Sequence, residues 1–218
     1  MLRVIASLIH RLLDFVVPRG CAGCEAPVHE RALWCADCSE SVVTLPNDLV
    51  QTVQGHRLIS VFAYGGPVAN TIHRLKYKNR PELALGLGRR LAREVTLAKL
   101  PQDSVIVPVP ATAERIVERG YNQAALLASA IARNTEFCCR PTALKRIHSG
   151  QHQVGADKAQ RAQLVAGAFV ASARLIKNAN VILVDDVVTT GATSAACAEA
   201  IEAAGAQLVA IVAVARVL

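Results

Sequence analysis

Two adjacent carboxylates, Asp185 and Asp186, stand just before a run of small and hydroxylated residues, Thr189-Thr190-Gly191-Ala192-Thr193. Four branched or long apolar residues, Val181–Val184, precede the pair and predict a strand that is buried on both faces, as in a parallel sheet. The stretch Ala195–Ala204 is rich in helix-forming residues and ends before a glycine. The pattern predicts a strand, an acidic pair, a short loop and a helix.

Each part of this pattern suits a sugar phosphate. The carboxyl ends of strands line the ligand crevice in open parallel sheets, so we expect both aspartates at its mouth, where they could hold hydroxyl groups. Gly191 lets the loop backbone approach a ligand closely, and free N–H groups of the loop and of the helix start form an anion site. The loop contains no lysine, so it is not the nucleotide-binding P-loop. The alternative, a turn with an ordinary aspartate cap, leaves the order and spacing unexplained.

Four cysteines near the N-terminus form two Cys-x-x-Cys pairs, Cys21 with Cys24 and Cys35 with Cys38. Two such pairs at short separation can arrange four thiolates around one Zn²⁺. Disulfides are the alternative, but nothing in the sequence indicates secretion, and reducing compartments disfavour disulfides. We therefore predict a structural zinc site with no open coordination position and no catalysis by the metal.

The remaining cysteines fit no ligand spacing and are expected to be small apolar fillers of the core: Cys138, Cys139 and Cys197. Leu33 and Trp34 are expected to pack beside the zinc site.

Size and composition indicate a folded protein with one substantial core and a small appendage, since 52% of the 218 residues are hydrophobic and 19% are charged. No apolar run approaches the roughly 18–20 residues of a membrane span. Apolar positions in residues 2–17 recur with helical spacing and predict a helix docked on the domain. A membrane-surface anchor is the less favoured alternative for this segment.

The formal charge of +7 suits an acidic partner such as a phosphorylated substrate or nucleic acid, although a mildly basic protein without such a partner has the same balance. Seven basic residues between Thr71 and Arg93 stand against Glu82 alone and form a candidate patch: Arg74, Lys76, Lys78, Arg80, Arg89, Arg90 and Arg93.

Strands and helices alternate along the rest of the chain, which predicts an α/β fold. Strands are expected at Leu58–Tyr64, Ser104–Pro110, Thr142–Arg146, Ala168–Val170 and Gln207–Arg216. Helices are expected at Val68–Tyr77, Glu82–Leu97 and Ala113–Arg133, the last broken near Arg119-Gly120. Leu45–His56 is predicted to be a linker, and Ser149–Asp157 a mobile loop that could close over a substrate.

Three cations are candidates for contact with a phosphorylated ligand. Arg115 and Arg119 follow the strand that ends at Pro110, in a segment expected to face the crevice, and suit a pyrophosphate. Lys76 ends a predicted helix and could reach the same ligand, although a solvated basic face explains it equally well.

The string Val181–Thr193 resembles the 5-phosphoribosyl-1-pyrophosphate (PRPP) motif of type I phosphoribosyltransferases, a hydrophobic strand followed by Asp-Asp and Thr-Thr-Gly-x-Thr. The resemblance implies that the acidic pair serves the ribose hydroxyls and that the threonine loop holds the 5-phosphate. Further segments extend it to the ComF family of competence proteins: Cys21–Cys38, Lys76-Tyr77, Val107–Pro110, Arg119-Gly120-Tyr121-Asn122-Gln123 and Arg146.

The ComF resemblance implies a zinc module (residues 1–56) on a type I phosphoribosyltransferase-like domain (residues 57–218), a parallel sheet flanked by helices. It implies a cytoplasmic protein that handles single-stranded DNA, with a DNA-translocating helicase-like protein as a further partner, and PRPP bound with Mg²⁺. The implied catalytic residues are Asp185 and Asp186. The implied PRPP-binding residues are Lys76, Val109, Pro110, Arg115, Arg119, Asp185, Asp186, Val188, Thr189, Thr190, Gly191, Ala192 and Thr193.

Three functions fit these observations. The first is a PRPP-binding protein of DNA uptake, without required catalysis, because fold does not fix function. The second is a true transferase that moves ribose 5-phosphate to an acceptor, although little sequence follows the last predicted strand to form an acceptor loop. The third is nucleic-acid binding with a vestigial pocket, against which the intact acidic pair and threonine loop argue.

Overall fold

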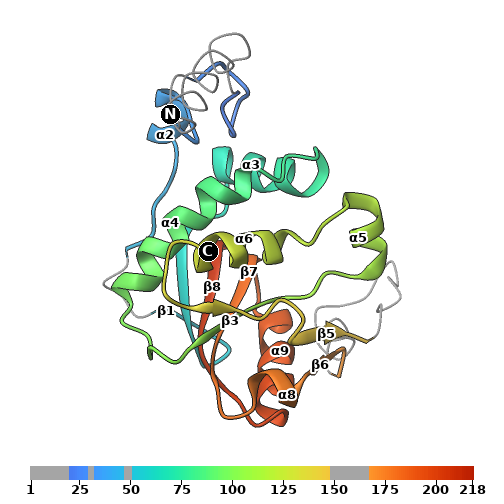
Figure 1. Ribbon diagram of the computed structural model, residues 1–218. Coiled ribbons are helices and arrows are strands. Elements are labelled where there is room, and N and C mark those ends of the chain that lie inside the picture. The colour runs from blue at the N-terminus through green and yellow to red at the C-terminus, as the bar shows by residue number, and fades with distance from the viewer. Residues whose placement is uncertain (1–19, 29–31, 47–50, 148–166) are drawn as a thin grey trace, which may run out of the picture.

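The computed structural model describes residues 20–28, 32–46, 51–147 and 167–218 (Figure 1). The predicted helix at residues 2–17 and the predicted loop Ser149–Asp157 lie outside these ranges. In the described part of the chain, no helix combines the length and apolar character that crossing a bilayer requires.

A six-stranded sheet forms the centre of the fold. Its strands lie in the order β1 (Gln51–Val53), β2 (His56–Ala63), β8 (Gln207–Arg216), β7 (Asn180–Val188), β3 (Val105–Pro108) and β4 (Cys138–Cys139). All neighbours are parallel except β1, which runs antiparallel to β2. The predicted parallel sheet is therefore confirmed.

Helices cover both faces of this sheet (Figure 1). One core cluster joins the sheet to α3 (Gly66–Tyr77), α4 (Leu83–Leu97) and α6 (Gln123–Ala132). A second cluster on the other face joins it to α9 (Ala192–Ala203) and to a two-stranded sheet of β5 (Leu144–Arg146) and β6 (Phe169–Ala171). Shorter helices are α2 (Ala36–Glu40), α5 (Ala113–Arg119) and α8 (Ala173–Ile176).

Local sequence explains why these elements begin and end where they do. Val181–Val184 are completely buried at the centre of the sheet, as their apolar run predicts. Gly120 ends α5 with a left-handed φ of 80°, and the Asn122 side chain accepts a hydrogen bond from Ala124 N to start α6. The predicted break near Arg119-Gly120 is thereby confirmed.

Several predicted elements need correction. Gln51–Val53 form strand β1, not linker, because the hairpin pairs them with β2, which local composition does not reveal. Strand β7 extends to Val188, so the acidic pair lies within the strand and not after it. Helix α9 starts at Ala192, which makes Thr193 helical and not part of the loop.

The three cysteines outside the N-terminal group differ in burial. Cys197 is completely buried, as predicted. Cys138 is exposed and is not a core filler, because β4 is a short edge strand that turns this residue to solvent. Cys139, its neighbour, is half-buried against the core cluster.

Candidate functional site: an acidic pair beside a phosphate loop

The acidic pair lies near the carboxyl end of β7, where the sheet opens to ligands. Asp186 N donates a hydrogen bond to Asp185 Oδ1 at 2.8 Å, which joins the two residues. Burial, and then the neighbouring Asp186 carboxylate, raises the pKa of Asp185 well above its ordinary value. Two carboxylates held this closely favour binding of a cation or of hydroxyl donors.

Lys76, at the end of α3, provides one such cation. Its Nζ lies 2.5 Å from Asp186 Oδ2, and both side chains are largely buried. Among the described residues this oxygen has no hydrogen-bond partner besides the ion pair. A buried carboxylate oxygen without full hydrogen bonding is costly, so it is a position where a ligand would be stabilised.

The loop after β7 consists of small residues and is partly exposed. Thr189 and Thr190 are exposed, and Gly191 has a left-handed φ of 78°, a conformation that favours glycine. The first turn of α9 follows at once, so its N–H groups point toward the loop with the positive end of the helix dipole. This geometry is compatible with a bound phosphate group, and phosphate binding by the loop stays a prediction.

The two predicted arginines, Arg115 and Arg119, lie in different surroundings in the structure. Arg119 is buried, donates a hydrogen bond from Nη1 to Gln123 Oε1 at 3.0 Å, and lies over the Tyr77 ring at 4.6 Å. Arg115 is exposed on α5, and its charge lowers the pKa of Arg146, an effect second to that of burial. Arg119 therefore joins Lys76, whereas Arg115 does not.

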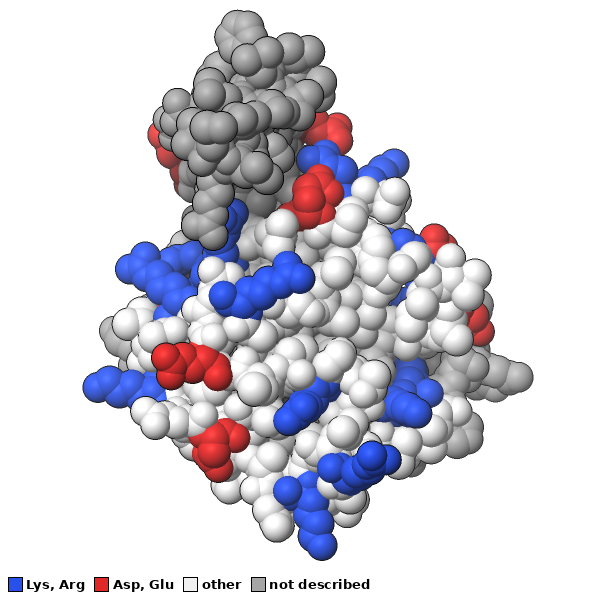
Figure 2. Space-filling model, in the orientation of Figure 1, with Lys and Arg blue, Asp and Glu red and all other residues white. Residues whose placement is uncertain are grey.

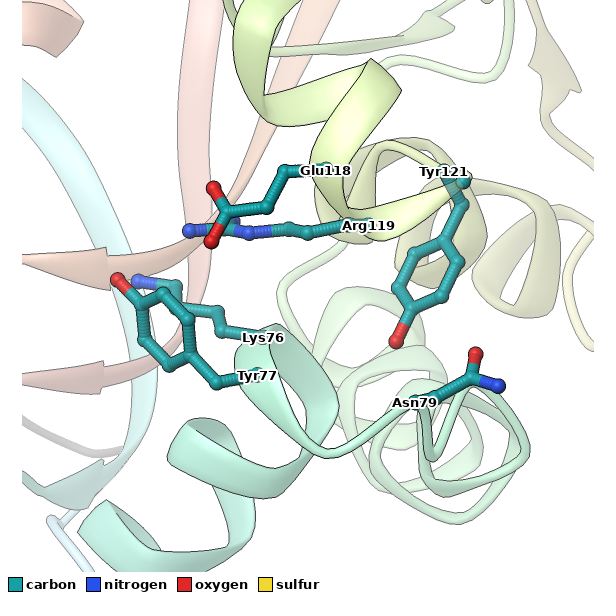
Figure 3. A pocket seen from close by; sticks show the side chains of 7 residues that line it. Lys76, Tyr77, Asn79, Glu118, Arg119 and Tyr121 are labelled. Atoms are coloured by element: carbon teal, nitrogen blue, oxygen red, sulfur yellow. The ribbon is translucent and has the colours of Figure 1, made fainter.

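A cavity of about 490 Å³ brings Lys76 and Arg119 together (Figure 3). Its lining is Lys76, Tyr77, Asn79, Glu118, Arg119, Gly120 and Tyr121. The polar ends of Lys76, Tyr77, Glu118 and Arg119 point toward one another, and Tyr121 and Asn79 close the opposite side (Figure 3). Lys76 belongs both to this cavity and to the ion pair with Asp186, so the cavity offers a ligand the positive charges of Lys76 and Arg119.

The residue after strand β3 already makes hydrogen bonds within the protein. Val109 N donates to Val184 O at 2.9 Å, and its carbonyl accepts from Asn122 Nδ2 at 3.0 Å. Val109 is buried and Pro110 half-buried. A role of these two residues in PRPP binding stays a prediction.

Several residues around this site were given no site role from the sequence. Glu118 and Tyr121 line the cavity, and the Tyr121 hydroxyl donates to Leu75 O at 2.6 Å. Gln54, placed in the predicted linker, donates from Nε2 to the carbonyl of Thr190. The glycine directly after Gln54 is a local signal for a tight turn, but no local signal indicates the contact with Thr190.

The four N-terminal cysteines converge, with their sulfur atoms all within 4.8 Å of one another. Cys21 Sγ accepts hydrogen bonds from the backbone N–H groups of Gly23 and Cys35, at 3.4 and 3.2 Å. Burial raises the pKa of Cys21, but backbone hydrogen bonds together outweigh burial and lower it to about 6. The cluster can hold a metal ion.

Helix α3 holds this cysteine module against the sheet domain. Arg74 Nη1 donates to the carbonyls of Cys21 and Ala22 at 3.2 and 2.6 Å. Trp34 Nε1 donates to Thr71 Oγ1 at 2.8 Å, and its ring and the Phe62 ring pack in a T-shaped arrangement. The expected packing of Trp34 beside the cysteines is confirmed.

Much of the predicted basic patch is used inside the protein. Arg74 and Lys76 make the contacts described above, and Arg80 and Arg90 pair with Glu82 and Glu94. The other three, Lys78, Arg89 and Arg93, are exposed and pair with no carboxylate in the part of the chain that the structure describes. Basic side chains outnumber acidic ones on the face seen in Figure 2.

Comparisons with known proteins agree with this architecture. The phosphoribosyl transferase domain family matches residues 120–218. The chain is 31% identical over 209 residues to DNA utilization protein YhgH of Salmonella typhi, covering 91% of this chain and 90% of that protein. It is 30% identical over 191 residues to Competence protein F of Haemophilus influenzae, covering 79% and 80%. Competence protein ComFC of Bacillus subtilis is 28% identical over 173 residues, covering 79% and 67%. With a cysteine cluster on a phosphoribosyltransferase domain and these relatives over most of its length, the chain belongs to the ComF family of competence and DNA utilization proteins.

Proposed function

We propose that the protein binds PRPP with Mg²⁺ and acts in the handling or uptake of single-stranded DNA in the cytoplasm. The observation that carries the proposal is the buried Asp186 Oδ2, which has Lys76 as its ionic partner and lies beside a loop of small and hydroxylated residues. The names of the relatives, DNA utilization protein and Competence protein F, support the biological role.

In this proposal the ligand lies across the carboxyl end of β7. The 5-phosphate accepts hydrogen bonds from the N–H and hydroxyl groups of residues 189–193, and the ribose hydroxyls donate hydrogen bonds to Asp185 and Asp186. The pyrophosphate extends toward Lys76 and Arg119 in the cavity. Mg²⁺ suits phosphate oxygens and carboxylates and supplies neutralisation of the pyrophosphate charge when bound.

We propose that the metal of the cysteine cluster is Zn²⁺. Four converging thiolates are the soft ligand set of structural zinc, and four sulfur ligands leave no position open for a reacting water. The metal thus shapes the module and takes no part in phosphoribosyl chemistry.

The proposed DNA surface uses the basic residues that the fold leaves exposed, Arg89 and Arg93 on α4 and Lys78 after α3. Cations bind single strands through their phosphates, without reading sequence. A helicase-like translocating protein is the partner that would deliver such a strand.

The second candidate function is transfer of ribose 5-phosphate to an acceptor. It is favoured by the cavity beside Lys76, which has room for more than a pyrophosphate and carries an exposed Tyr77 ring and the Glu118 carboxylate. In such a reaction the bond from ribose C1 to the pyrophosphate oxygen breaks and pyrophosphate leaves with the electron pair. A lone pair of the acceptor forms the new bond to C1, and the acceptor releases its proton to solvent. The acidic pair would stabilise positive charge on the ribose.

Calorimetric titration of the full chain with PRPP and Mg²⁺ tests the first proposal. Wild-type protein is expected to bind, and Asp185→Asn/Asp186→Asn to lose binding, since the ribose hydroxyls lose their acceptor charges. Glu114→Gln, an exposed acidic change on α5 outside the cavity lining, is the control and should bind as wild type does. Absence of wild-type binding would end the PRPP proposal.

A screen for pyrophosphate release separates the two candidate functions. Binding without release across nucleobases and amines supports the first function, whereas acceptor-dependent release supports the transferase. A Glu118→Gln variant that binds PRPP normally but releases no pyrophosphate would place the acceptor in the cavity.

Salt dependence of single-stranded DNA binding tests the DNA surface. Arg89→Gln/Arg93→Gln should weaken binding and reduce the slope of log affinity against log salt by about 1.4, at about 0.7 for each phosphate contact. Arg174→Gln/Lys177→Gln near the amino end of β7 removes the same charge and should leave the slope unchanged. No binding by wild type at any salt concentration would remove DNA from the proposal.

A further inference from the structure

The β1–β2 hairpin contacts the threonine loop, although 136 residues separate the two contact residues in the sequence. Gln54 Nε2 donates a hydrogen bond to the Thr190 carbonyl at 2.9 Å. A Cβ added to Gly191 would lie 2.3 Å from Val53 Cγ2 and 3.1 Å from Gln54 Cγ. The hairpin therefore packs directly on the backbone of the loop that we assign to the 5-phosphate.

The hairpin is built to hold this position. Gln54 and Gly55 have φ values of 50° and 80°, the left-handed pair that forms a tight two-residue turn. Ser60 Oγ donates to Gln51 Oε1 at 3.0 Å, which ties the two strands together by their side chains. Val53 packs against the core cluster that also contains Val188, at the end of β7.

The contact fixes the direction of one peptide group in the loop. In a trans peptide the C=O and N–H groups point in opposite directions. Since the Thr190 carbonyl points to Gln54, the N–H of Gly191 points away from the hairpin. Crowding by Val53 adds to this restraint, because a residue larger than glycine would force the loop away.

We propose that Gln54 is a positioning residue of the phosphate loop. Its amide holds the Thr190–Gly191 peptide so that Gly191 N–H is presented to the 5-phosphate of a phosphoribosyl ligand. This inference rests on the proposed function. A hairpin outside the PRPP motif orients that motif before the ligand binds. Pre-orientation of this kind raises affinity because less ordering remains to be done on binding.

Titration of the full chain with three probes tests the inference: ribose 5-phosphate, PRPP with Mg²⁺, and pyrophosphate with Mg²⁺. Gln54→Ala and Gln54→Met are both expected to bind the first two about threefold to tenfold more weakly, the range for one neutral hydrogen bond. Gln54→Met has a similar length and no charge but cannot donate, so it separates the hydrogen bond from packing. Pyrophosphate affinity should not change, because that part of the ligand lies toward Lys76.

Controls separate positioning from general destabilisation. Thr52→Ala, an exposed change on the same hairpin, should leave all three affinities unchanged. Without ligand, NMR order parameters of the Thr190 and Gly191 amides should be lower in Gln54→Ala than in wild type, because the loop loses the contact that holds it. Equal affinities in wild type and both Gln54 variants, or equal losses for all three probes, would overturn the inference.

The proposed function fails in a different way. If wild-type protein binds neither ribose 5-phosphate nor PRPP, both the proposed function and the positioning role of Gln54 are wrong. If wild type binds both and the Gln54 variants bind equally well, only the positioning role is lost.

Discussion

The cysteine cluster and the acidic pair both gather groups that repel one another once ionised, and both lie against α3. In the cluster, backbone N–H groups turned to Cys21 Sγ stabilise negative charge, and four ligand atoms converge. In the acidic pair, burial and mutual repulsion raise the pKa of Asp185, and Lys76 alone among the described residues offers a balancing charge to Asp186.

The cysteine cluster is therefore a complete binding site, whereas the acidic pair is completed only by a ligand. The chain itself supplies every ligand that a structural metal needs at the cluster. At the acidic pair the chain leaves a buried oxygen with incomplete hydrogen bonding, a cost that a ligand can relieve. Changes at the two sites should therefore alter stability in opposite directions.

The largest expected effect is at the cluster. Cys38→Ser should abolish binding of one zinc per chain and unfold the cysteine module, since binding of structural zinc contributes on the order of 10 kcal/mol to folding such modules. Metal content by mass spectrometry and melting temperature measure the two consequences.

Cys138→Ser is the matched control, because this exposed cysteine lies on β4, outside the cluster. It should keep zinc and melt as wild type does. Full zinc content in Cys38→Ser protein would mean that the cluster is not the metal site.

A smaller effect is expected where α3 holds the module. Arg74→Ala removes both hydrogen bonds to the Cys21 and Ala22 carbonyls and should cost about 2 kcal/mol. Because those carbonyls flank a metal ligand, zinc should pass to a chelator several times faster than from wild type. Lys78→Ala, an exposed change just after the same helix, should leave the release rate unchanged, and equal rates in both variants would contradict the role of Arg74.

The elements that local sequence dictates were predictable. Val181–Val184 form a buried strand because four apolar residues in a row have no solvent face. The cysteine spacing predicted convergence of the sulfur atoms for a similar reason, since metal geometry limits how such pairs can fold. The acidic pair and its loop could be recognised because type, order and spacing agree with one chemistry.

Contacts between distant segments were not predictable from one sequence. Nothing near Gln54 indicates that it meets Thr190, and the short polar strand β1 depends on pairing with β2. The basic residues from Arg74 to Arg93 looked alike in sequence, yet ion pairs and carbonyl contacts leave only some of them for a partner. Which charges are used internally is settled by the tertiary structure.

The smallest expected effect has the opposite sign. Asp185→Asn should raise the melting temperature of the ligand-free protein at neutral pH, since it replaces a half-buried acid with a neutral group that can still accept from Asp186 N. The pKa of Asp185 is raised in the folded state, so the unfolded chain loses this proton first as pH rises above 3.8. Wild type therefore loses stability relative to the variant as pH rises from about 4, until the raised folded pKa is passed. Melting temperatures from pH 4 to 8 should diverge accordingly. Parallel curves would show that the pair carries no such cost, and the contrast with the cysteine cluster would then rest on ligand binding alone.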